Sequence, residues 1–242
     1  MSQGAFALLG SGEFEAWHQE VDRWLLDRTE GDGSVLILPT ASAREGDEVF
    51  DGWGAKGLEH YERLGIPARI VRIREHEDAE QAEFVDEVSR ASMVFFSGGN
   101  PWYLAETLRD TAFFRAMDER LGKGLAYAGC SAGVACLSEL TYDSDTEDFE
   151  NVFKPGLGTV RGTLFGPHWD MLNTWIPGAT EMIASSVPDG GRLVAIDEET
   201  AMFGDGASWS VAGRSGVHIL QDGIWADHVA GETFTLDLFG ER

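Results

Sequence analysis

The feature that most limits what this chain can fold into is a set of five short, mostly apolar runs. They span residues 5–9, 34–38, 68–72, 93–96 and 124–130, and most are followed at once by glycine, proline or serine. The segments between them predict helices over about 13–28, 46–64, 79–90, 101–109 and 111–122. Apolar strands that alternate with helices are typical of a parallel sheet covered on both faces.

The last third of the chain has a different pattern. Short alternating segments at 208–211, 216–220, 224–225 and 233–236, joined by turns at Gly213 and Asp222-Gly223, predict antiparallel hairpins. We therefore predict a single α/β domain over residues 1–242, a three-layer sandwich with a mostly parallel central sheet and flavodoxin-like winding. Residues 205–242 are predicted to form a β-rich C-terminal extension that lengthens or caps one edge of the sheet.

Charge and composition exclude several classes of function. With a net charge of −24 over 242 residues, the chain is expected to be repelled by nucleic acid and by anionic membranes. The same charge either serves solubility or favours a cationic substrate. The N-terminus has no basic region or cleavage site, no apolar run is long enough to span a membrane, and only Cys130 and Cys136 are cysteines. We expect a cytoplasmic protein.

Neither a cofactor nor a metal is expected. Gly10-x-Gly12 lacks the third glycine of a dinucleotide fingerprint, and no His-Glu-x-x-His or clustered Cys/His spacing occurs.

The fifth apolar run ends in Gly129-x-Ser131-x-Gly133, which small apolar residues follow. Strand, sharp turn and helix in this order form a nucleophile elbow, in which the serine Oγ stands clear of the sheet. The motif is short enough to arise by chance, so its weight depends on the rest of the chain.

A second glycine-rich turn, Ser97-Gly98-Gly99-Asn100, follows the fourth apolar run. Paired glycines at the carboxyl end of a strand can leave N–H groups pointing into a cleft, where they suit a developing oxyanion. The alternative is a tight turn that only leads into a helix.

A serine nucleophile needs a base within hydrogen-bond reach. His168 is the best candidate among six histidines, because it follows Pro167 in a loop downstream of the serine. The other five lie on or beside predicted helices or in the hairpin region: His18, His60, His76, His218 and His228.

Five short motifs together resemble the dipeptidase E and cyanophycinase family of serine peptidases, which has the class I glutamine amidotransferase-like fold. They are Leu9-Gly10-Ser11-Gly12-Glu13, Pro39-Thr40-Ala41-Ser42, Phe96-Ser97-Gly98-Gly99-Asn100, Gly129-x-Ser131-Ala132-Gly133 and Pro167-His168. The resemblance runs from about residue 5 to residue 200.

The resemblance implies Ser131 as nucleophile, His168 as base and an oxyanion hole made by the N–H groups of Gly99 and Ala132. It places the third member of the triad after the elbow, where Asp145 and Glu147 are the candidates. Asp170 is a weaker one, because it follows the base too closely in the chain.

In this family, dipeptidase E cleaves after an N-terminal aspartate and cyanophycinase cleaves a β-aspartyl-arginine polymer. The arginines that follow the histidine in the cyanophycinase branch are absent here, which favours small peptides such as Asp-x dipeptides. Expected substrate-binding residues are Gly98, Asn100, Tyr103, Arg161 and Trp169.

Two other functions and the oligomeric state stay open. One alternative is an amidotransferase-like amidase that uses Cys130, and another is a catalytically silent protein that binds a ligand in the same cleft. A homodimer is also possible.

Overall fold

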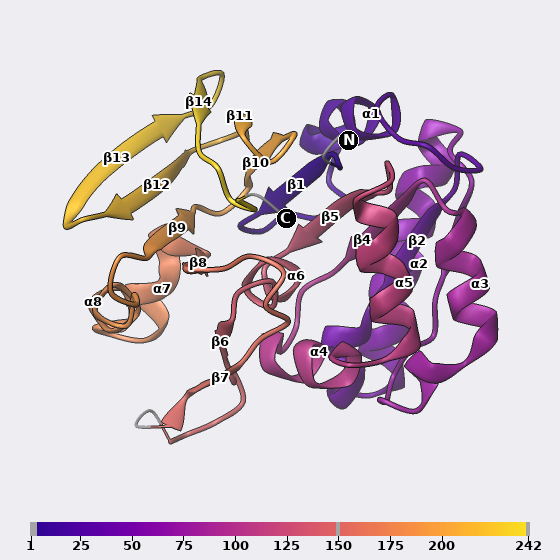
Figure 1. Cartoon of the computed structure of the whole chain (residues 1–242), viewed down its shortest axis with the longest axis horizontal. Coiled ribbons are helices and arrows are strands. Elements are labelled where there is room, and N and C mark those ends of the chain that lie inside the picture. Colours follow the sequence, from indigo (N-terminus) through magenta and orange to yellow (C-terminus); the bar gives the residue numbers. More distant parts are fainter. Residues whose placement is uncertain (1–3, 149–150, 241–242) are drawn as a thin grey trace.

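The computed structural model describes residues 4–148 and 151–240, and its centre is an eight-stranded sheet in the order β14-β11-β10-β1-β5-β4-β2-β3 (Figure 1). Five neighbouring strands are parallel: β1 (Phe6–Leu9), β5 (Ala126–Cys130), β4 (Met93–Phe96), β2 (Val35–Leu38) and β3 (Ala68–Ile70). The predicted parallel core is confirmed.

Helices cover both faces of this sheet, so its central strands are apolar on both sides. Side chains alternate along each strand, and in β1 Ala7 and Leu9 join one core while Phe6 and Leu8 join the other. The helices that pack on the two faces are α1 (Gln19–Leu26) and α2 (Asp47–Leu64) on the first, and α3 (Ala82–Arg90), α4 (Pro101–Leu108) and α5 (Ala112–Leu121) on the second.

The first helix is shorter than the sequence predicts. Residues 13–15 form a turn instead of a helical start, and a short 3-10 segment, η1 (Ala16–His18), precedes α1. Phe14 has a φ of 63° and its ring packs 4.5 Å from that of Phe95. Burying this ring fixes a backbone that cannot be helical, so tertiary packing overrides the helical pattern.

The C-terminal strands divide between two sheets. Strands β10 (Thr200–Gly204), β11 (Ser208–Gly213) and β14 (Thr233–Thr235) extend the main sheet beside β1 in antiparallel fashion, as predicted, although the extension already begins at Thr200. A separate sheet, which the sequence did not predict, has the order β13-β12-β9-β8. Its strands are β8 (Thr163–Pro167), β9 (Arg192–Ile196), β12 (Gly216–Gln221) and β13 (Ile224–Val229).

Short elements complete the described chain. They are 3-10 segments η2 (Thr40–Glu45) and η3 (Asp78–Glu80), helices α6 (Ala132–Ala135), α7 (Trp169–Trp175) and α8 (Ala179–Ser185), and the pair β6 (Leu140–Tyr142) and β7 (Phe153–Pro155). Within residues 4–148 and 151–240, no helix is long and apolar enough to cross a lipid bilayer.

Candidate active site

Ser131 occupies the sharp turn between β5 and α6. Its backbone has φ 51° and ψ −105°, a conformation that side-chain-bearing residues rarely adopt. The Ser131 N–H donates to the carbonyl of Leu9 over 3.0 Å, which fixes the turn to the end of β1. Backbone strain of this kind is held in place by its surroundings and is concentrated at functional sites.

The two glycines of the motif are required by close packing. A Cβ on Gly129 would lie 2.3 Å from the carbonyl oxygen of Gly133, and a Cβ on Gly133 would lie 2.5 Å from that of Phe96. The spacing Gly-x-Ser-x-Gly therefore follows from the tight approach of the turn to itself and to β4.

His168 stands directly after β8 and completes a chain of hydrogen bonds. Its Nε2 lies 2.8 Å from Ser131 Oγ, and its Nδ1 lies 3.1 Å from Oε1 of Glu198. The side chains of His168 and Glu198 are 23% and 26% exposed, so the array is open to a ligand on one side. Like Ser131, His168 has a positive φ, 57°.

The carboxylate at His168 comes from Glu198, a residue that the sequence analysis did not select. The loop after β9 holds it, where its N–H donates to Asp170 Oδ1 over 2.9 Å and its carbonyl accepts from Thr200 Oγ1 over 3.0 Å. Asp170, the weaker candidate for the acid, thus supports the backbone of Glu198. A signal was available, because residues 197–199 directly follow the apolar run 193–196.

The structure corrects the expectation for Asp145 and Glu147. Asp145 Oδ2 accepts a hydrogen bond from Asn100 Nδ2 over 2.7 Å, and Glu147 is exposed in the same loop. The physical reason is that this loop, between β6 and β7, is tied through Asn100 to the start of α4, whereas His168 is carried by the second sheet.

The predicted oxyanion donors lie beside Ser131 with free N–H groups. Among the described residues, the backbone N–H groups of Gly99 and Ala132 donate no hydrogen bond, whereas that of Gly98 donates to Glu13 and that of Asn100 to the carbonyl of Ala41. Gly99 has a φ of 139°, and a Cβ there would lie 2.5 Å from the carbonyl of Ala41. Two unused N–H groups next to a serine hydroxyl are the donors that an oxyanion needs.

Ser131 and His168 line a cleft of about 390 Å³. Its charged side chains are three glutamates and one lysine, and burial together with the nearby charge of Asp145 raises the pKa of the Glu45 carboxyl. The complete lining is Ser11, Gly12, Glu13, Glu15, Glu45, Trp53, Lys56, Gly98, Gly99, Ser131 and His168.

Four of the five expected substrate-binding residues lie outside this lining; Gly98 is the exception. Asn100 is buried and caps α4 by accepting the N–H of Tyr103, whose hydroxyl in turn donates to the carbonyl of Arg74. Trp169 packs against Trp225, and Arg161 is exposed. Asn100, Tyr103 and Trp169 thus make internal contacts, whereas Arg161 is exposed outside the lining.

Trp175, on α7, is an aromatic residue that the sequence analysis missed. Its ring lies 5.2 Å from that of His168, and the residue is 53% exposed.

Cys130 is poorly suited to act as a nucleophile. The residue is fully buried, and its Sγ–H donates to Oε2 of Glu13 over 2.9 Å. Burial and the adjacent Glu13 raise the pKa of the Cys130 thiol well above its ordinary value, which opposes formation of the thiolate.

One group among the described residues has the composition of a metal site: His18, Asp22 and His60. Both rings point a nitrogen at the same oxygen, Asp22 Oδ2, over 3.0 and 2.7 Å, and the rings stack 4.8 Å apart. Metal-bound histidines pass their second N–H to an acceptor, but His18 Nε2 and His60 Nδ1 have no such partner within the described chain. The geometry fits a hydrogen-bonded network better than a metal centre.

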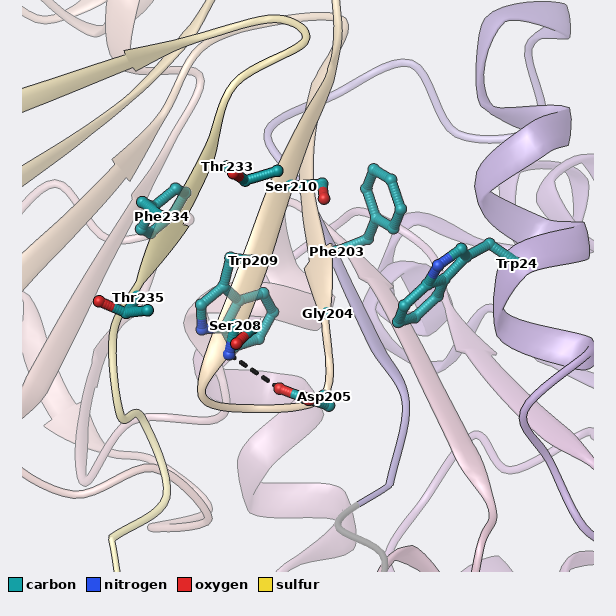
Figure 2. Close-up of a pocket in the computed structure, with 10 residues that line it drawn as sticks. All are labelled: Trp24, Phe203, Gly204, Asp205, Ser208, Trp209, Ser210, Thr233, Phe234 and Thr235. Carbon is teal, nitrogen blue, oxygen red and sulfur yellow. Dashed lines mark hydrogen bonds between the residues drawn. The ribbon is translucent and has the colours of Figure 1, made fainter.

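A second hollow, of about 450 Å³, lies at the edge of the main sheet near β10, β11 and β14 (Figure 2). Trp24 and Phe203 form one wall and Phe234 lies on the opposite side of Trp209, while Asp205 accepts the N–H of Ser208 over 2.8 Å. Its lining includes neither Ser131 nor His168, so the chemistry belongs to the first cleft.

Comparison with known proteins identifies the family of this chain. The family model of peptidase family S51 matches residues 6–211. Cyanophycinases from Synechococcus elongatus and Thermosynechococcus vestitus are each 26% identical over 228 residues, which is 90% of this chain and 68% of the relative.

Two solved structures are also similar. A peptidase from an acI-B1 actinobacterium is 31% identical, with a TM-score of 0.88 over 96% of this chain and 97% of that one. A candidate peptidase E protein from Listeria monocytogenes, 18% identical, has a TM-score of 0.60 over 94% and 99% of the two chains, which is a likeness of fold.

Proposed function

The chain belongs to peptidase family S51 and is a serine-type peptidase, and we propose that it hydrolyses small peptides through Ser131, His168 and Glu198. The observation that carries this assignment is the unbroken chain of hydrogen bonds from Ser131 Oγ through the His168 ring to Glu198. This is the arrangement in which a base activates a hydroxyl and a carboxylate orients the base.

In the proposed mechanism His168 Nε2 takes the proton of Ser131 as Oγ bonds to the substrate carbonyl carbon. The carbonyl oxygen becomes an oxyanion that the N–H groups of Gly99 and Ala132 stabilise. His168 then gives the proton to the leaving amine as the C–N bond breaks, which leaves an acyl-enzyme. Water then bonds to the acyl carbon while the same ring takes its proton, and the ring returns that proton to Ser131 Oγ as the acyl–Oγ bond breaks and the acid leaves.

The charge of the cleft bears on the substrate. Three glutamates against Lys56 make an additional carboxylate unfavourable, so we propose that Asp-x dipeptides, which the family resemblance suggests, are poorer substrates than peptides with a neutral or cationic acyl residue. A volume of about 390 Å³ is typical of small-ligand sites, which supports short peptides.

We also propose a cytoplasmic location, which the two free and buried cysteines support. If the protein forms a homodimer, the exposed Ile224, Trp225 and Val229 on edge strand β13 are one apolar surface available for it. Analytical ultracentrifugation measures the oligomeric state directly.

A fluorophosphonate probe tests the assignment. Wild-type protein is expected to be labelled and Ser131→Ala to resist labelling, while Ser89→Ala, an exposed serine on α3, serves as the matched control and retains the label. Labelling that survives in Ser131→Ala would overturn the assignment. A panel of Asp-x, Ala-x and Lys-x dipeptides then ranks the substrates, and a wild type that binds these without cleaving them would favour the silent alternative.

A further inference from the structure

Glu13 lies at the active cleft without belonging to the Ser131–His168–Glu198 array. Two residues with positive φ, Gly12 at 78° and Phe14 at 63°, bracket it and turn its side chain inward. Glu13 is only 8% exposed, whereas Glu15, two residues later, is exposed. A buried carboxylate at a site of this kind needs partners that repay its desolvation.

The two oxygens of Glu13 bind donors from two different strand ends. Oε1 accepts the N–H of Gly98, two residues after the end of β4, over 2.9 Å, and Oε2 accepts the Sγ–H of Cys130, the last residue of β5, over 2.9 Å. Glu13 itself follows β1. One side chain thus joins the carboxyl ends of three neighbouring strands at the edge of the sheet that carries Ser131.

Hydrogen bonds fix the peptide groups on both sides of the Gly98–Gly99 peptide group, namely Ser97–Gly98 and Gly99–Asn100. On one side Glu13 holds the Gly98 N–H, and on the other the Asn100 N–H donates to the carbonyl of Ala41 over 2.9 Å. Between them the Gly99 N–H donates to no acceptor in the part of the chain that the structure describes. A Cβ added to Gly98 would lie 3.3 Å from Glu13 Oε1 and 3.6 Å from Ser131 Cβ, so Gly98 lies close to both the carboxylate and the nucleophile.

We infer that Glu13 is a positioning residue: its hydrogen bond to the Gly98 N–H aligns the Gly98–Gly99 turn so that the Gly99 N–H meets the oxyanion formed at Ser131. This inference rests on the proposed function. The role depends on hydrogen-bond acceptance and not on charge, since a negative charge by itself would oppose an oxyanion nearby.

Two substitutions of the Glu13 side chain are expected to have different effects on catalysis. Glu13→Gln keeps an acceptor for the Gly98 N–H, while Glu13→Ala removes it and leaves that N–H buried without a partner. Loss of one oxyanion donor costs about 10²–10³-fold in kcat, and misalignment of a donor that is still present costs less. We therefore expect Glu13→Ala to lower kcat about 10–100-fold with KM nearly unchanged, and Glu13→Gln to stay within about threefold of wild type.

The experiment measures fluorophosphonate inactivation rates and affinity for a peptide aldehyde, whose adduct with serine places an oxygen in the oxyanion hole. Both are expected to fall in Glu13→Ala by the same factor as kcat, and to be preserved in Glu13→Gln and in Glu20→Ala, an exposed glutamate on α1. Urea unfolding of each variant identifies the folded fraction to which the rates are normalised.

Three results would overturn the inference. Wild-type rates in folded Glu13→Ala would show that the turn needs no such support. A loss confined to KM would make Glu13 a substrate contact, and a Glu13→Gln variant as slow as Glu13→Ala would make its charge the essential property. Ser131→Ala is measured in parallel: if it is still inactivated, the proposed function fails, whereas its resistance with any of these three results refutes the role of Glu13 alone.

Discussion

Two clusters of histidine and carboxylate lie in this molecule and have opposite surroundings. In the first, His168 bridges Ser131 and Glu198 at the carboxyl ends of the strands, with about a quarter of each acidic and basic side chain exposed. In the second, His18 and His60 share one oxygen of Asp22 between α1 and α2, where the three side chains are at most 2% exposed.

The two clusters differ in whether their hydrogen-bond partners are all internal or include a group that faces a cleft. Asp22 accepts from two rings and from the Tyr61 hydroxyl, so all its donors are internal. In His168, by contrast, one ring nitrogen is hydrogen-bonded to Glu198 and the other to the Ser131 hydroxyl, which faces a cleft. Similar functional groups therefore serve folding where they are enclosed and chemistry where one partner is open to a ligand.

The sharpest test of this contrast is Ser131→Ala. We expect peptide hydrolysis to fall on the order of 10⁵-fold, because the nucleophile is lost, while the free energy of unfolding changes by less than about 1 kcal/mol. Steady-state kinetics and urea unfolding measure the two quantities. Substantial activity in this variant would contradict the assignment of the first cluster.

Glu198→Gln is expected to lower kcat about 10³–10⁴-fold, because the amide can neither orient the imidazole correctly nor stabilise the imidazolium. The control is Asp145→Asn, which changes the carboxylate that the sequence suggested and is expected to remain within about threefold of wild type. If Asp145→Asn were the slower variant, the acid would have been misassigned.

The buried cluster is broken by Asp22→Ala. Removing Asp22 leaves two buried ring nitrogens and the Tyr61 hydroxyl without their acceptor, at about 1–3 kcal/mol for each buried group, so we expect a loss of about 3–5 kcal/mol in the free energy of unfolding, with kcat per folded molecule unchanged. Burial alone would raise the pKa of the Asp22 carboxyl, but its bonds to His18 and His60 outweigh burial and lower it.

Because its folded-state pKa is lowered, Asp22 contributes stability above the ordinary pKa of 3.8, and this contribution is lost as the pH falls toward the lowered value. Acid unfolding of the wild type should therefore show this loss and that of Asp22→Ala should lack it. A variant that unfolds like the wild type would show that the cluster adds little stability.

A third histidine–carboxylate pair is His218 with Asp197. Changing it is expected to have the smallest effect on the free energy of unfolding. A hydrogen bond to Asp197 and, against the opposing effect of burial, a second one to Asp227 raise the pKa of His218 to about 9. The stability from this charged ring is complete below its ordinary pKa of 6.5 and is lost as the pH rises to about 9. Since the side chain is 25% exposed, solvent screening limits the loss to about 1 kcal/mol.

Unfolding titrations at pH 6 and about pH 9.5 measure this contribution of His218 to the free energy of unfolding. We expect His218→Gln to abolish the difference between the two, and His76→Gln, an exposed histidine bound to the carbonyl of Glu106, to leave it intact. An equal pH response in wild type and His218→Gln would contradict the assignment.

Local sequence was enough for the parts of the site that depend on short-range geometry. The apolar runs predicted the parallel strands, and Gly129-x-Ser131-x-Gly133 predicted the turn, because only glycine permits approaches of 2.3 and 2.5 Å on either side of the serine. The pair Gly98–Gly99 and the Pro167-His168 step could be singled out for similar reasons, as features of one turn or one strand end.

Tertiary structure alone decided the rest. Glu198 reaches His168 because β8 and β9 pair in parallel, with Pro167 opposite Ile196, in a second sheet of which local sequence indicated only the hairpin of β12 and β13. Asp145, although closer to His168 in the chain than Glu198, is drawn to Asn100 instead. Strand pairing over long sequence separations is fixed by which apolar faces pack together, so the sequence by itself pointed to Ser131, His168 and the parallel core, and only packing brought Glu198 to His168.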